Sequence, residues 1–148
     1  MKKKLALYFS NNYGCDCCTR LDFYNLMDKI ELLCEYADID MRFVLPKHGD
    51  ITEIHKWKPD LFIYGSFLWK NGLPKGMTNR THLQKMFKNT VLVEVSLYED
   101  DSDSSDFVLW TKDKRDEYEK GGKSSLKNRL DDTYLNKICV DIVKKIKQ

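Results

Sequence analysis

Hydrophobic and polar positions follow two patterns along this chain, short apolar runs and longer stretches with an apolar residue every three or four positions. Apolar runs of strand length occur five times and are separated by turn-forming residues. They are Lys3–Ser10, Met41–Pro46, Asp60–Ser66, Thr90–Leu97 and Phe107–Thr111. The third and fourth runs are apolar almost throughout, which is typical of central parallel strands buried on both faces. The fifth is expected at a sheet edge.

The stretches between these runs have helical spacing. The first apolar stripe consists of Phe23, Leu26, Ile30, Leu33 and Ala37, which predicts a helix from about 17 to 37. A short second helix must stop before Pro59, because the proline disfavours the α conformation at Lys58. Further helices are predicted over about 78–88 and 131–147.

Strands and helices therefore alternate, and alternation with buried strands favours an α/β fold with helices on both faces of the sheet. We predict a three-layer sandwich with a mostly parallel sheet of about five strands, an arrangement that resembles the flavodoxin fold. The 148 residues fit one domain, 1–148. Within it, residues 112–130 are charged and punctuated by glycine, and we expect an insertion that is partly helical or mobile.

The composition predicts the cellular environment of the protein and the classes of partner that it does not bind. The formal charge is +2, and the basic stretches are either very short or interleaved with acids, so no nucleic-acid partner is predicted. No apolar run approaches the roughly 18 residues of a membrane span, and the first run is too short for a signal peptide. We therefore expect a cytoplasmic protein that does not bind membranes.

The fold predicts where a ligand would bind. In open parallel sheets the site lies at the carboxyl ends of the strands, near the point where strand order reverses. Three loops meet this condition, namely Ser10–Asp16, Ser66–Met77 and Leu97–Asp106. Because the rule comes from the fold alone, it locates a site without giving its chemistry.

The first loop offers donors for an anion. Small polar residues lead into a helix, whose N-terminal amides and dipole favour negative charge. The candidate phosphate contacts are Ser10, Asn11, Asn12, Gly14 and Thr19. The alternative is that this is an ordinary turn between a strand and a helix.

The second loop adds aromatic surface. Ser66 is followed by Phe67, Leu68 and Trp69, directly after a buried strand. Aromatic rings beside an anion cradle suit a flat heteroaromatic ligand that carries phosphate. The alternative is that Trp69 packs back onto the core.

Two stretches, "YFSNNYG" and "DLFIYGSFLWKNGLP", resemble the corresponding loops of flavodoxins and related FMN-binding proteins. The resemblance implies an FMN cofactor used in electron transfer. Ser10, Asn12 and Thr19 would contact its phosphate and Trp69 would flank the flavin. Tyr98 would supply a second ring, although the carboxylates of "YEDDSDSSD" beside it are unfavourable for an anionic cofactor.

The opening "LALYFSNNYGCD" is also similar to the first strand and loop of the TIR-like family. TIR enzymes that cleave NAD use a glutamate on the helix after the third strand. Residues 78–88 contain none, and Gln84 is the nearest equivalent. This resemblance implies a regulatory or signalling module that binds a nucleotide or a protein partner without redox chemistry. Whether the chain is an enzyme is left open by both resemblances.

Three cysteines, Cys15, Cys17 and Cys18, lie within four positions at the predicted start of the first helix. A helix N-terminus lowers a thiol pKa and a second thiol is close by, so these are redox candidates beside the simpler reading of inert loop residues. No metal site is predicted, because no second cysteine or histidine pair completes four ligands. Cys34 and Cys139 lie on apolar helix stripes and are expected in the core.

Overall fold

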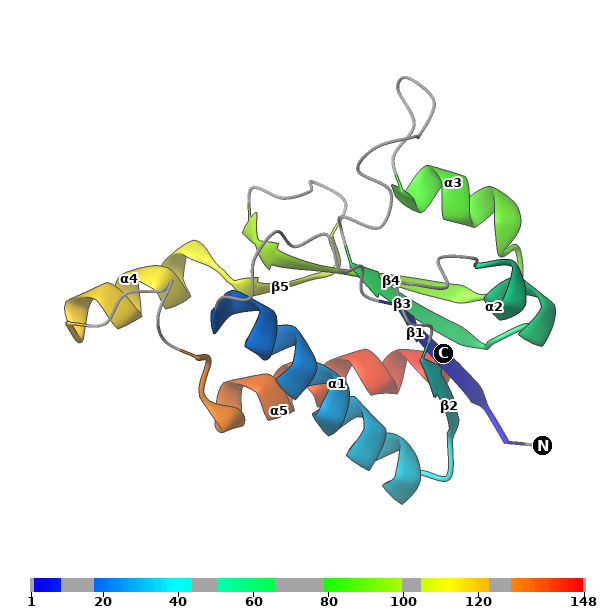
Figure 1. Ribbon diagram of the computed structural model, residues 1–148, viewed down its shortest axis with the longest axis horizontal. Coiled ribbons are helices and arrows are strands. Elements are labelled where there is room, and N and C mark those ends of the chain that lie inside the picture. Colours follow the sequence, from blue (N-terminus) through cyan, green and yellow to red (C-terminus); the bar gives the residue numbers. More distant parts are fainter. Residues whose placement is uncertain are drawn as a thin grey trace.

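A computed structural model of the protein describes residues 2–8, 18–43, 51–65, 79–99, 105–122 and 129–147, without the side chains at 18–21, 79 and 147. These ranges contain five strands and five α-helices, followed by one 3-10 helix, and strands and helices alternate from β1 to β4 (Figure 1). They are β1 (Lys4–Tyr8), α1 (Cys18–Tyr36), β2 (Asp40–Phe43), α2 (Thr52–Trp57), β3 (Leu61–Gly65), α3 (Asn79–Met86), β4 (Val91–Tyr98), β5 (Phe107–Trp110), α4 (Lys112–Lys120), α5 (Asp132–Lys144) and η3 (Lys145–Lys147).

The five strands form one sheet in the order β2-β1-β3-β4-β5, and every neighbouring pair is parallel. This is the flavodoxin-like order of doubly wound sheets, in which the chain runs outward from β1 in one direction and then in the other. The predicted fold class is therefore confirmed. The predicted central strands are β3 and β4, and β5 lies at the sheet edge as expected.

Each face of the sheet packs against its own helices (Figure 1). On one face, α1 and α5 cover alternate strand residues such as Leu7, Ile63 and Val93. On the other face, α2 and α3 cover a smaller cluster that includes Phe62 and Tyr64. Because successive strand residues point to opposite faces, strands that are apolar throughout supply both cores.

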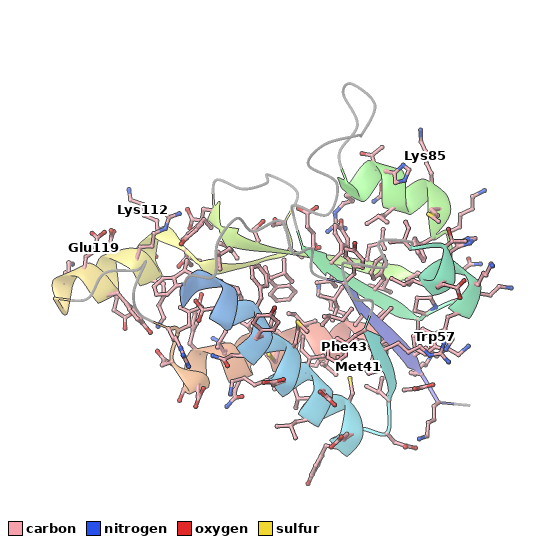
Figure 2. All side chains as sticks on the ribbon, viewed as in Figure 1. Met41, Phe43, Trp57, Lys85, Lys112 and Glu119 are labelled. Atoms are coloured by element: carbon pink, nitrogen blue, oxygen red, sulfur yellow. The ribbon has the colours of Figure 1, made fainter. Side chains whose placement is uncertain are left out.

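The helices and strands begin and end close to the predicted positions, with one difference. The second strand was predicted to extend from Met41 to Pro46, whereas β2 ends at Phe43 and residues 44–50 lie outside the described ranges. Figure 2 shows Met41 and Phe43 on this edge strand, and Phe43 is 40% exposed. The charged stretch after β5 contains a regular helix, α4, whose N-cap Thr111 accepts from the Lys114 amide.

The crossover from β4 to β5 is unusually short. Val95 pairs with Phe107, and eight residues, 99–106, separate the end of β4 from the start of β5 in the sequence. This is less than the roughly dozen residues that a helical crossover between parallel strands uses. The next helix, α4, instead follows β5 and extends beyond the edge of the sheet (Figure 1).

A buried carboxylate ties the C-terminal third of the chain to α1. Asp22 is 0% exposed, and its two oxygens accept from the Trp110 indole N–H at 2.7 Å and from the Leu130 amide at 3.0 Å. Trp110 in turn packs edge-on against Tyr118 of α4, with 4.8 Å between ring centroids. Burial raises the pKa of Asp22, and the two hydrogen bonds oppose this rise.

Among the described residues, no helix is both long enough and apolar enough to cross a membrane.

Candidate functional site

The carboxyl ends of β1 and β3 lie side by side. Tyr8, the last residue of β1, pairs with Tyr64 of β3. The segments that begin at residues 9 and 66 therefore leave the sheet from adjacent strands at the same edge. The strand order reverses between these two strands. This is the place where a doubly wound sheet binds its ligand.

Most of the predicted site residues lie outside the described ranges. These are Ser10, Asn11, Asn12, Gly14, Cys15, Cys17, Ser66, Phe67 and Trp69. Cys18 and Thr19 lie in the first turn of α1, where only the backbone is described. The roles proposed for Cys18, Thr19 and the nine residues outside the described ranges remain predictions.

Tyr98 is the predicted site residue whose side chain is described. It is the last residue of β4 and is partly buried. The guanidinium of Arg115, on α4, lies 4.8 Å from the centroid of its ring, which is within the range of a cation–π interaction. A cation from the charged stretch that was predicted to be partly helical or mobile therefore covers one face of the ring expected to stack on a ligand.

A row of polar side chains crosses the sheet at the same edge. Tyr8 pairs with Tyr64, Tyr64 pairs with Glu94, and Asp106 exchanges hydrogen bonds with the Glu94 backbone. Tyr8, Tyr64 and Glu94 are at most 5% exposed. Burial raises the pKa of both tyrosines, and the Glu94 carboxylate raises that of Tyr64 further. Both phenols therefore keep their protons at neutral pH.

Hydroxyl groups surround the Glu94 carboxylate. The Ser105 hydroxyl donates to Glu94 Oε2 at 2.9 Å and also contacts the buried Ser96 hydroxyl. The carboxylate thus lies in a small polar network on β3, β4 and the segment before β5. The network therefore holds a buried acceptor beside protonated hydroxyls.

Sequence reasoning did not identify this row. The available signal was Glu94, the only charged residue in the apolar run Thr90–Leu97, because a carboxylate inside a buried strand requires hydrogen-bonding partners. The partners were not visible, since Tyr64 belongs to another strand and meets Glu94 only through the register.

Asp106 fixes the short crossover beside this row. Its Oδ2 accepts from the Glu94 amide at 2.8 Å and from the guanidinium of Arg80 at the start of α3. We expect Asp106→Ala to lower the free energy of unfolding by about 2 kcal/mol, because hydrogen bonds to a charged group are worth roughly 1.5–3 kcal/mol. Urea denaturation measures the change. Asp106→Asn, which keeps one acceptor, should lose less, and an alanine variant as stable as wild type would contradict the assignment.

The structure places no metal centre in the part of the chain that it describes, where no three His, Cys, Asp or Glu side chains come close enough to hold an ion. Cys34 and Cys139 are buried, as predicted. Burial raises the pKa of Cys34 to about 11 and that of Cys139 to about 12, so both remain unreactive thiols at neutral pH.

Comparisons with known proteins yield structural likenesses only. No family model matches the chain, and no curated protein sequence matches it. A flavodoxin from the domain Archaea aligns over 98% of this chain and 99% of its own, with 10% identity and a TM-score of 0.43. A short-chain flavodoxin associated with a non-canonical PDU bacterial microcompartment aligns over 99% of both chains, with 12% identity and a TM-score of 0.45.

These likenesses are distant, and the assignment of the fold does not depend on them. The sheet order and its all-parallel pairing define a flavodoxin-like α/β protein. Its candidate ligand site is the carboxyl edge at Tyr8, Tyr64 and Glu94.

Proposed function

We propose that the protein binds a phosphate-bearing cofactor of the FMN type at the carboxyl edge and serves in electron transfer. The observation that carries the proposal is the pairing of Tyr8 with Tyr64 at the reversal of strand order. The loop rich in small polar residues and the loop with Phe67 and Trp69 follow these two strands. A flavin needs both kinds of surface, donors for its phosphate and rings for its isoalloxazine.

The described charges suggest how such a ligand would be oriented. Carboxylates lie on the β4–β5 side of the edge, at Glu94, Glu99 and Asp106, although Asp106 is ion-paired with Arg80. The 19-residue helix α1 begins on the β1 side. The carboxylates repel a phosphate, whereas the dipole at the N-terminus of α1 favours it. We therefore assign the phosphate to Ser10–Thr19 and the ring system to Ser66–Trp69. When bound, the flavin would supply the electron chemistry and the protein its orientation and electrostatics.

One observation favours a second candidate, a regulatory module that binds a nucleotide or a protein partner without redox chemistry. Arg115 covers one face of Tyr98, the ring proposed to stack on a flavin.

Titration of the protein with FMN, followed by quenching of flavin fluorescence, tests the first proposal. We expect Trp69→Ala to weaken binding about 5- to 140-fold, since ring stacking contributes roughly 1–3 kcal/mol. Trp57→Ala is the matched control, because Trp57 ends α2 at the opposite edge of the sheet, where Arg42 stacks on its ring at 4.5 Å. It should bind FMN normally.

Thermal shifts with NAD, ADP-ribose and cyclic nucleotides separate the two candidates. A ligand at 100 times its dissociation constant adds about 2.7 kcal/mol of stability. Stabilisation by one of these nucleotides and none by FMN would replace the flavin proposal with the nucleotide module.

A further inference from the structure

A cleft lies at the amino edge of the sheet, away from the site proposed above. It has a volume of about 620 Å³, which is within the range of roughly 300–1,000 Å³ found for small-molecule sites. Its walls are the C-terminal end of α2 with residues 58–60, and the C-terminal end of α3 with residues 87–90. Figure 2 marks Trp57 on the first of these helices and Lys85 on the second.

The charge that lines this cleft is mainly positive. Lys58, Lys85 and Lys88 line it together with a single carboxylate, Asp60. Asp60 is already engaged, because its Oδ2 accepts from the Lys4 amide at 2.9 Å. Within the ranges that the structure describes, none of the three ammonium groups forms an ion pair. The cleft thus has an excess of exposed cations.

Lys58 is held in a conformation that its residue type disfavours. It caps α2 with φ 56° and ψ 64°, the left-handed region that usually selects glycine or asparagine. The following Pro59 normally confines the preceding residue to extended conformations, which adds to the strain. Strained residues of this kind concentrate at binding sites. A lysine at this position places a third cation on the cleft.

The floor of the cleft is apolar. Pro59 and Phe87 are buried, and Phe87 packs edge-to-face with His55 at 5.4 Å between ring centroids. Met86 is partly buried beside them. A ligand that matched both features would carry its negative charge at one end and an apolar body at the other.

We propose that this cleft binds a small organic dianion, with its charged group held by Lys58, Lys85 and Lys88 and its apolar body on Phe87. Phosphate monoesters and aromatic dicarboxylates share this chemistry. The competing explanation is that the lysines only offset the dipoles of the two helix C-termini. That explanation requires neither a cleft nor an unfavourable conformation at Lys58.

Amide chemical shifts of ¹⁵N-labelled protein, titrated separately with phenyl phosphate, phthalate and inorganic phosphate, test the proposal. We expect phenyl phosphate to shift the amides of His55, Lys88 and Asn89 and to bind more tightly than inorganic phosphate, which lacks the apolar body. Comparison with phthalate shows whether a phosphate or a dicarboxylate is preferred. The double variant Lys85→Gln/Lys88→Gln should weaken phenyl phosphate binding at least about tenfold.

Lys137→Gln/Lys144→Gln is the matched control. It removes the same charge from exposed positions on α5, and Lys144 lies in the last turn of that helix. We expect it to leave binding unchanged. The proposal is overturned if this control weakens binding as much as the cleft variant, if the cleft amides do not shift, or if shifts appear only at the carboxyl edge. None of these outcomes alters the effect of Trp69→Ala on FMN binding, which tests the first site alone.

Discussion

Asp22→Ala is expected to lower the free energy of unfolding by about 3–4 kcal/mol. The substitution leaves two buried N–H donors without their acceptor, the Trp110 indole and the Leu130 amide. Each unsatisfied buried donor costs roughly 1–3 kcal/mol. The loss would loosen β5 and the start of α5 from α1. Urea unfolding followed by intrinsic fluorescence, to which Trp110 contributes as one of three tryptophans, measures the change. Asp22→Asn keeps one acceptor oxygen and should lose about half as much.

The same carboxyl group predicts a pH dependence. Its pKa is raised in the folded protein, chiefly by burial, so the folded state holds this proton to a higher pH than the unfolded chain does. Its contribution to stability should therefore decline as the pH rises from the ordinary aspartate range through the raised pKa. The wild-type protein should show a steeper decline over that window than Asp22→Asn. Parallel curves for the two proteins would contradict the raised pKa.

Ile63→Ala is expected to cost about 3 kcal/mol or more. Ile63 is fully buried on the central strand β3, between Leu7 of β1 and Val93 of β4. Removal of a large aliphatic side chain from such a core costs roughly 2–5 kcal/mol, because the transfer free energy is lost and a cavity remains. Chemical denaturation measures the effect.

Leu32→Ala provides the comparison for Ile63→Ala. Leu32 lies on α1 but is 65% exposed, so its truncation should change the free energy of unfolding by less than about 0.5 kcal/mol. If the two variants lost equal stability, β3 would not be the centre of the sheet, and the placement of the candidate site would fail with it.

The sequence predicted the fold well because its strongest signals are local. The run Asp60–Ser66 is apolar on both faces, which is possible only for a strand covered on both sides, and β3 occupies that position. The stripe from Phe23 to Ile30 likewise required one buried helix face, and α1 buries it against the sheet. Periodicity of this kind identifies an element before any tertiary contact is known.

The site was harder to predict because its described residues meet only through the register and the packing. Glu94 was visible as a charge in an apolar strand, whereas its neighbours Tyr64 and Ser105 come from other parts of the chain. Likewise, nothing in the charged stretch after β5 indicates that Arg115 stacks on Tyr98. Contacts between residues far apart in sequence depend on the tertiary arrangement, which spacing does not specify.

The central claim is that a phosphate-bearing ligand binds where β1 and β3 end side by side. Amide shifts of ¹⁵N-labelled protein during titration with FMN test it most directly. We predict shifts at Tyr8, Gly65, Cys18 and Thr19, and the same shifts in Lys85→Gln/Lys88→Gln, in which binding of the FMN phosphate to the cleft at the opposite edge is weakened. Absence of FMN binding, or shifts confined to Asn89 and Thr90, would contradict the account.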